Sequence, residues 1–205
     1  MSLYEKHILP CLTHLVCSGK TFDQKRSVVV PDARGDVLEI GMGSGLNIPH
    51  YEQHNIRQLI GLEPSEALRK RAQATARKAG IPLKLISNGA EDIPLENKSM
   101  DTVLITFAMC TIPEIETALD EIRRVLKQNG QLLFCEHGLA PDTRVQRWQN
   151  RLNPVWKKLA GGCNLNRDIP SLIQQAGFKI DEIENQYMRG PKALTYIYRG
   201  TASVK

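Results

Sequence analysis

The sequence of 205 residues is poor in aromatic residues, at 5%, and contains no closely spaced cysteine pair. Its five cysteines are odd in number and scattered, without a Cys-x-x-Cys motif, which argues against a zinc site and against a disulfide framework. We therefore predict a reducing compartment and no bound metal. These cysteines are Cys11, Cys17, Cys110, Cys135 and Cys163.

The sequence also has no hydrophobic run long enough to cross a bilayer, which takes about 20 apolar residues. The candidate segment, Ile8–Val16, is short and is interrupted by Pro10 and His14. The N-terminus shows no succession of basic, apolar and small residues such as a signal peptide has. These absences predict a cytoplasmic protein without a transmembrane segment, and they leave peripheral contact with a membrane open.

Positive charge is concentrated in one part of the chain. Residues 144–205 hold 11 lysines and arginines against 4 acidic residues, a net charge of +7, and the formal charge of the whole chain is +5. The cations are dispersed, and no aromatic side chains are interleaved to stack on bases. We interpret this region as a solvated surface, and we expect no nucleic-acid partner.

Predicted strands alternate with predicted helices, a pattern typical of a parallel sheet with helices on both faces. The predicted strands are Asp36–Ile40, Gln58–Leu62, Leu83–Ser87, Thr102–Phe107, Gln131–Cys135, Phe178–Ile183 and Ala193–Tyr198. The last two are expected to close the sheet as an antiparallel pair. The predicted helices are Ser65–Lys78, Glu114–Lys127, Ile169–Ala176 and the amphipathic stretch Val145–Leu159, broken at Pro154.

The most informative stretch, residues 37–45, reads Val-Leu-Glu-Ile-Gly-Met-Gly-Ser-Gly. An apolar strand runs into three alternating glycines, which accept positive φ and leave no Cβ to block a ligand. A dinucleotide site requires Gly-x-Gly-x-x-Gly, but Leu46 stands where its third glycine belongs. Glu39 would repel a pyrophosphate and could hold a cationic amino-acid group. The glycines are Gly41, Gly43 and Gly45. The pattern resembles motif I of the class I S-adenosylmethionine (SAM) methyltransferases.

Further segments resemble motifs of that family in the expected order. Glu63, followed by Pro64, ends the second predicted strand, where the family binds the ribose hydroxyls. Residues 88–95 resemble the adenine-binding turn, which implies a side-chain contact from Glu91 and a backbone contact from Ala90. Asp92 is the alternative side-chain partner.

Thr106 is the last residue but one of the fourth predicted strand, next to Phe107, and the C-terminal edge of this strand in the family faces the methionine part of SAM. That strand opens with Ser99-Met100-Asp101, which resembles the family's (S/F)-D motif. Residues 125–132 resemble its Arg-Val-Leu-Lys-Pro-Gly-Gly turn, with Gln128-Asn129 as a departure. The resemblance covers roughly residues 36–136.

This resemblance implies a fold, a cofactor and a reaction. The fold is a Rossmann-like, doubly wound α/β sheet of seven strands, mostly parallel with an antiparallel C-terminal strand. The cofactor is SAM, with S-adenosylhomocysteine as product. We expect one domain over residues 1–205, with a helical cap at 1–30 and helices at 138–176 that build the acceptor pocket. Tyr4 is placed to join that cap. The oligomeric state is not specified.

The methyl acceptor is predicted to be a small, apolar molecule. His137 is the candidate general base, with Glu136 beside it, and the alternative is a histidine that only bonds a nearby backbone group. Trp148 and Trp156 belong either to an apolar lid over the pocket or to the core. Cys110 and Cys163 are interpreted as buried thiols without a nucleophilic role.

A narrower resemblance concerns a methyltransferase-like subfamily whose animal members methylate alkyl thiols at lipid membranes. It rests on residues 106–112, on Glu136-His137, on residues 154–157 and on residues 162–167. Those members carry an N-terminal hydrophobic anchor that is not evident here, so membrane association stays open. The resemblance favours a thiol or another soft nucleophile as acceptor.

Three alternatives remain beside a small-molecule thiol methyltransferase. A phospholipid or quinone-type methyltransferase differs only in its acceptor. A nucleic-acid methyltransferase is disfavoured because the Asn/Asp-Pro-Pro-aromatic motif of base-modifying enzymes is missing after Thr106. A non-catalytic SAM-binding protein is the third, and no residue of the motifs favours it.

Overall fold

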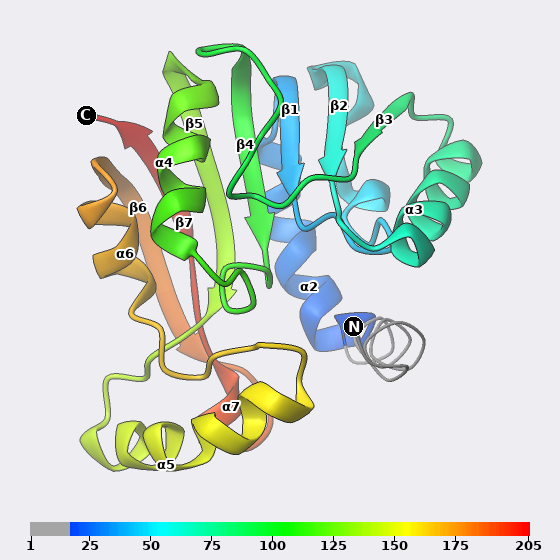
Figure 1. Cartoon of the computed structure of the whole chain (residues 1–205). Coiled ribbons are helices and arrows are strands. Elements are labelled where there is room, and N and C mark those ends of the chain that lie inside the picture. The colour runs from blue at the N-terminus through cyan, green and yellow to red at the C-terminus, as the bar shows by residue number, and fades with distance from the viewer. Residues whose placement is uncertain (1–16) are drawn as a thin grey trace.

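A seven-stranded sheet forms the centre of the molecule, with helices on both faces (Figure 1). The computed structural model describes residues 17–205. The strands are ordered β3-β2-β1-β4-β5-β7-β6, and β7 runs antiparallel to both of its neighbours, whereas the first five are parallel. The strands are β1 (Gly35–Ile40), β2 (Ile56–Leu62), β3 (Leu83–Ile86), β4 (Met100–Thr106), β5 (Leu126–His137), β6 (Phe178–Tyr187) and β7 (Tyr196–Val204). The predicted fold class is confirmed.

Each face of the sheet carries its own hydrophobic core. Leu38 and Ile40 of β1 pack on the face of the sheet that is covered by the helices at residues 115–125 and 169–175. Val37 packs on the opposite face, which is covered by the helix at residues 66–79. Because both faces are covered, the parallel strands are apolar almost throughout. The α-helices are α2 (Lys20–Val29), α3 (Glu66–Ala79), α4 (Ile115–Val125), α5 (Thr143–Leu159), α6 (Ile169–Gln175) and α7 (Lys192–Thr195), and short 3-10 turns cover Val30–Asp32, Ile48–His50 and Gln53–Asn55.

Helix α3 begins and ends where its capping residues predict. The hydroxyl of Ser65 accepts from the amide of Leu68, and Gly80 adopts φ +70° at the C-terminal end. A side-chain acceptor at the first turn and a left-handed glycine after the last one satisfy backbone groups that the helix leaves unpaired.

The break predicted at Pro154 is wrong, because helix α5 continues through this residue. Both Pro154 and Asn150, whose carbonyl would accept the missing hydrogen bond, are exposed. Solvent can therefore take the place of the bond that the proline ring removes, and the cost to the helix is lowered.

The last predicted strand is misplaced in the sequence analysis. Residues Lys192–Thr195 form a helical turn, and β7 runs from Tyr196 to Val204. The register of β6 against β7 shifts between Ile180 and Glu182, next to Gly200, and a Cβ on Gly200 would be 2.1 Å from the carbonyl oxygen of Glu182. A glycine in mid-strand marks such a bulge rather than the end of the strand.

The turn predicted at Asn129-Gly130 lies within β5, which begins at Leu126. The pairing with β4 is irregular between Met100 and Thr102, and it becomes regular at Gln131. Asp101, from the (S/F)-D motif, stands at this amino end of the sheet, where its carboxylate binds Lys127 at 2.8 Å. Its role is therefore to hold strands together, far from the carboxyl ends.

The carboxyl ends of β1, β2, β4 and β5 meet at one edge of the sheet, near α2 and the segment that contains α5 (Figure 1). In doubly wound sheets this edge holds the ligand. Of the predicted cap at 1–30, residues 17–30 include α2, whereas residues 1–16, Tyr4 among them, lie outside the described part. None of the helices within residues 17–205 has the length and apolar character needed to cross a bilayer.

Candidate active site

The three glycines after β1 all adopt positive φ, at +64°, +59° and +81° for Gly41, Gly43 and Gly45. A Cβ on Gly41 would be 2.6 Å from the Cβ of Ala108, and one on Gly45 would be 2.6 Å from Ile48. Among residues 17–205, the atom nearest to a Cβ on Gly43 would instead be a backbone oxygen at 3.9 Å. Gly41 and Gly45 are therefore required by packing, whereas Gly43 faces open space.

That space is a cleft between the glycine loop, the end of β4 and α2. Its lining residues are Cys17, Arg26, Glu39, Gly41, Met42, Gly43, Ser44, Leu46, Asn47, Thr106 and Phe107. Arg26 of α2 was not identified from the sequence. Its guanidinium lies 5.1 Å from the ring centroid of Phe107 and donates to the carbonyl of Cys17 at 2.7 Å. Helix α2 thus covers one side of the cleft.

Glu39 is almost fully buried at the floor of the cleft. Its carboxylate accepts from Asn47 Nδ2 at 2.9 Å and from the Tyr51 hydroxyl at 2.7 Å. Burial raises the pKa of Glu39 to about 7, against the opposing effect of these two donors. Asn47 Nδ2 also donates to Thr106 Oγ1 at 3.0 Å, while Asn47 Oδ1 has no partner among residues 17–205. The cleft therefore offers both a carboxylate and an unfilled acceptor.

Glu63 joins the second strand to the glycine loop. One carboxylate oxygen accepts from the amide of Gly43 at 2.9 Å, and the other accepts from the amide of Ser65 at 2.8 Å. Burial raises the pKa of Glu63, and the two amides oppose that rise. Pro64, by contrast, is exposed.

The predicted adenine contacts lie beyond the cleft lining, at the end of β3. Ala90 is buried, and Glu91 is half-buried with one oxygen 3.5 Å from the amide of Glu114. Asp92 is exposed and accepts from Asn88 at 3.1 Å. Of the predicted cofactor residues, the cleft lining thus includes Glu39, Gly41, Gly43 and Thr106.

Glu136 is the last residue but one of β5 and is fully buried. One of its oxygens accepts from the amides of Ala108 at 2.8 Å and Met109 at 3.0 Å, and the other has no partner in the described chain. Burial raises its pKa to about 7. The carboxyl holds the loop after β4, which begins at Phe107 with a φ of +54°. Its contacts are those of a positioning residue.

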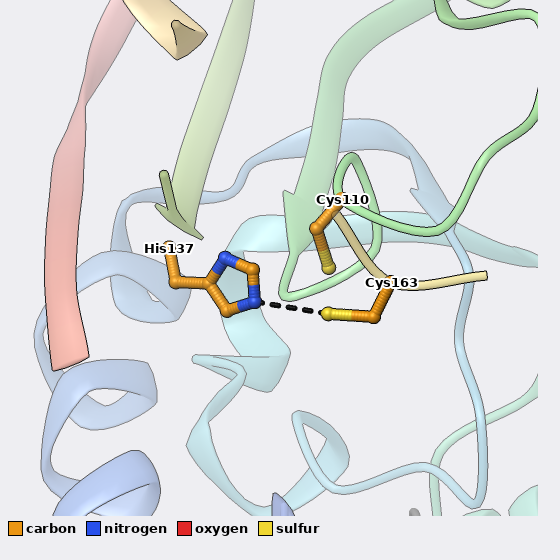
Figure 2. Close-up of side chains that lie close together, drawn as sticks. All are labelled: Cys110, His137 and Cys163. Carbon is orange, nitrogen blue, oxygen red and sulfur yellow. Dashed lines mark hydrogen bonds between the residues drawn. The ribbon is translucent and has the colours of Figure 1, made fainter. Parts of the chain in front are cut away.

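His137 lies together with two cysteines that were predicted to be separate buried thiols. Its Nε2 lies 3.0 Å from the Sγ of Cys163, and Cys110 completes the group (Figure 2). Burial lowers the pKa of His137, but Cys163 and Glu136 outweigh it and raise that pKa overall. The neighbouring Cys110 and burial raise the pKa of Cys163. No sequence spacing links these three residues.

The two tryptophans of α5 lie in different environments. Trp148 is 57% exposed, so of the two alternatives left open for it, a lid or the core, the core is excluded. Trp156 is half-buried, and its indole N–H donates to Cys163 Sγ at 3.3 Å. The loop after α5 is tied to the loop after β4 by Asn164, whose amide donates to the carbonyl of Cys110 at 2.8 Å.

Residues 38–134 match the family model described as a methyltransferase domain. The chain is 30% identical over 152 residues to thiol S-methyltransferase TMT1B of Rattus norvegicus, covering 73% of this chain and 62% of that relative. It is 27% identical over 172 residues to thiol S-methyltransferase TMT1A of Homo sapiens, covering 83% and 70%. Geranyl diphosphate methyltransferase in complex with SAM shares the fold, with a TM-score of 0.70, 14% identity, and coverage of 100% of this chain and 92% of that one.

The strand order, the glycine loop and the family match together define a class. Residues 38–134 carry the match to the methyltransferase domain family, and the chain shares its fold with a solved SAM-dependent methyltransferase. Within that class its sequence is similar to the thiol S-methyltransferases TMT1A and TMT1B. The chain spans 62% of the length of the rat relative. The family predicted from the sequence motifs is thereby confirmed.

Proposed function

We propose that the protein binds SAM in the cleft at the glycine loop and methylates the sulfur of a small apolar thiol. The observation that carries this proposal is the open space at Gly43, bounded by a buried carboxylate and by an unpartnered amide oxygen. When bound, SAM supplies a methyl group on a sulfonium, and its transfer is an in-line displacement that depends mainly on alignment.

The residues around the cleft fit the chemical groups of SAM. Glu39 and the oxygen of Asn47 suit its ammonium group, since both are acceptors in a water-poor site. Glu63 suits the ribose hydroxyls, because carboxylates form strong charge-assisted hydrogen bonds. Ala90 and Glu91 keep their predicted role at the adenine, and Arg26 of α2 stacks on Phe107 of the loop after β4 at the wall of the cleft.

A thiol acceptor is favoured over other soft nucleophiles by the relatives, two of which are named thiol S-methyltransferases. The side of the cleft beyond β4 and β5 is where the acceptor would enter, beside Met109, Cys110 and His137. Phospholipid-type, quinone-type and nucleic-acid acceptors, and a protein that only binds SAM, remain the alternatives.

An acceptor screen tests the proposed function. Purified protein is incubated with SAM and with an alkanethiol, the matching alcohol, the matching amine, a phenol, phosphatidylethanolamine vesicles or an oligonucleotide. The release of S-adenosylhomocysteine is measured. We expect release with the alkanethiol and none with the alcohol. Turnover restricted to the lipid or the oligonucleotide would contradict the thiol, and binding of SAM without any turnover would support a binding protein.

Replacing Glu63 by alanine should weaken SAM binding by about 1–3 kcal/mol, which is roughly 5–150-fold in Kd. The variant loses the ribose acceptor, and it also releases the amide of Gly43 from its 2.9 Å hydrogen bond. Isothermal titration with SAM measures the change.

Glu66→Ala is the matched control, because it removes an exposed acid from the same helix start, where Glu66 pairs with Lys70. It should leave the affinity for SAM within about twofold. Normal affinity of Glu63→Ala would show that the ribose lies elsewhere.

The helix α5 supports a further proposal, peripheral contact with an anionic membrane surface. Four apolar side chains at helical spacing are 40–62% exposed. They are Trp148, Leu152, Val155 and Leu159. The same helix carries five exposed cations and no acidic residue. An apolar stripe flanked by cations is typical of helices that lie in a lipid interface.

Val155→Glu should lower co-sedimentation with vesicles of anionic lipid by about tenfold, since it replaces a lipid-facing methyl pair by a charge. Ile183→Glu is the control, because Ile183 is also exposed but lies on β6. If both variants bind anionic vesicles equally, α5 does not form the membrane contact. If the unaltered protein binds neutral vesicles as well as anionic ones, the cations of α5 do not contribute to binding.

A further inference from the structure

Three metal-ligating side chains from separate parts of the chain meet at the ligand edge of the sheet. Cys110 follows β4, His137 ends β5 and Cys163 follows α5, and their two sulfurs and one ring nitrogen all lie within 4.8 Å of one another. Figure 2 shows the three side chains pointing toward one another. Cysteine sulfur and imidazole nitrogen are the ligands that Zn²⁺ prefers, and a tetrahedral site separates such atoms by about 3.5–3.8 Å. Small side-chain rotations therefore bring the group to zinc geometry.

The loops that carry the two cysteines are fixed against each other. Asn164 donates to the carbonyl of Cys110 through both its amide, at 2.8 Å, and its side chain, at 3.0 Å. The side chain of Arg167 donates to the carbonyls of Met109 and Ile112, on either side of Cys110. Such contacts hold the sulfurs in place before any ligand arrives, as metal sites require of their supporting residues.

The surroundings of the group suit a metal-bound thiolate. The indole N–H of Trp156 points to Cys163 Sγ at 3.3 Å, and an N–H donor stabilises negative charge on sulfur. Cys110 and Cys163 are 3% and 8% exposed, so bulk water has little access. Within residues 17–205 the group has three members and no fourth ligand. Three protein ligands with one open position are typical of catalytic zinc, whereas structural zinc has four.

The group also lies beside the cleft proposed for SAM. Ala108, two residues before Cys110, packs closely on Gly41. A Cβ added to Gly41 would be 2.6 Å from the Cβ of Ala108. Glu136, next to His137, holds the amides of Ala108 and Met109 in the same loop. A ligand in the open position of the metal would therefore border the glycine loop.

We propose that Cys110, His137 and Cys163 bind one Zn²⁺, and that its open position takes the sulfur of the acceptor. The metal site stands by itself, whereas the acceptor's place rests on the proposed function. Metal binding releases the protons of both cysteine thiols to solvent. The acceptor thiol likewise gives its S–H proton to water and binds as thiolate. Its sulfur then forms a bond to the methyl carbon as the carbon–sulfur bond of the sulfonium breaks, and that electron pair stays on the sulfur of S-adenosylhomocysteine.

The metal site is tested on the full chain, purified under reducing conditions without SAM. Zinc content is measured by elemental analysis, and Co²⁺ is titrated into the zinc-free protein as a spectroscopic probe. We expect about one metal per chain and a sulfur-to-cobalt charge-transfer band. Cys110→Ser and Cys163→Ser should each weaken Co²⁺ binding at least tenfold. Cys135→Ser is the control, since Cys135 is buried in β5 outside the group.

The Co²⁺ titration of the unaltered protein tests whether the metal site exists even where a variant folds poorly. Absence of the charge-transfer band in that protein, or an unchanged band in the Cys110→Ser/Cys163→Ser double variant, would overturn the metal site. Circular dichroism of each variant separates the loss of ligands from the loss of fold.

The acceptor's place is tested by adding hexanethiol or hexanol to the Co²⁺ protein. The thiol should increase the charge-transfer absorption, because it adds a third sulfur ligand, and the alcohol should leave it unchanged. An unchanged spectrum with the thiol would overturn this part. Titration of SAM into the zinc-free protein reports separately on the cofactor cleft, so failure of the proposed function and failure of the metal site are distinguished.

Discussion

Gly43→Val should abolish measurable SAM binding, with at least a 100-fold rise in Kd, which corresponds to about 2.7 kcal/mol. The added side chain would extend into the open space of the cleft, where the nearest atom to its Cβ is 3.9 Å away. It would occupy the volume in which SAM has to lie against the backbone. Isothermal titration with SAM and with S-adenosylhomocysteine measures the loss.

Gly80→Val separates this effect from backbone strain. Gly80 has φ +70°, close to the +59° of Gly43, and a Cβ on Gly80 would meet no atom of the described residues within 4 Å. In both variants the left-handed backbone conformation destabilises the fold by about 1–2 kcal/mol. Gly80, however, lies at the C-terminal end of α3, away from the cleft. We expect Gly80→Val to bind SAM normally with a lowered Tm. If both variants bind SAM normally, the ligand does not lie against Gly43.

The order of the strands and the place of the glycine loop could be predicted because their signals are local. Apolar runs, the cap at Ser65 and the end at Gly80 each depend on neighbours within one turn. The two elements that were predicted wrongly depend instead on their surroundings in the folded chain. The helix through Pro154 and the strand through Gly200 depend on exposure and on a bulge in a different strand. Only the assembled fold contains that information.

The candidate site divides in the same way. Glu39, Gly43 and Glu63 were found from their spacing along β1, the glycine loop and β2. In the structure Glu63 binds the amide of Gly43, which lines the same cleft as Glu39. Asn47 and Tyr51, which hold Glu39, follow the glycines without a distinctive pattern. A cluster such as Cys110 with Cys163 joins segments on either side of α5, so no spacing rule reveals it.

Glu136 links the predicted site to the stability of the protein. Burial raises its pKa from 4.5 to about 7, and the shift reflects a carboxylate charge that is costly to keep without water. One carboxyl oxygen accepts hydrogen bonds from two backbone amides. The fold therefore needs an acceptor at this position, although burial disfavours its negative charge. A neutral carboxyl still offers an acceptor oxygen to the two amides, although these donors favour the ionised form and oppose the rise in pKa.

Because the folded pKa lies above the unfolded value, Glu136 stabilises the fold fully below about pH 4.5, and this contribution is lost as the pH rises through 7. A shift of this size corresponds to about 3 kcal/mol. Glu136→Gln mimics the neutral carboxyl, so its stability relative to the unaltered protein should increase by about that amount between pH 4.5 and pH 8. Urea unfolding at both pH values measures the difference.

Glu136→Ala is the contrasting variant, because it leaves the amides of Ala108 and Met109 buried without an acceptor. At pH 4.5 it should lose about 2–5 kcal/mol relative to the unaltered protein, from two unsatisfied donors and a cavity. This difference should shrink by about 3 kcal/mol at pH 8, because only the unaltered protein is destabilised by the ionisation of Glu136. Turnover of Glu136→Ala should also fall, since the loop that carries Cys110 loses its anchor, while Glu136→Gln retains turnover. A Glu136→Gln variant that folds stably but has no activity would instead identify the ionised carboxylate as a participant in the reaction.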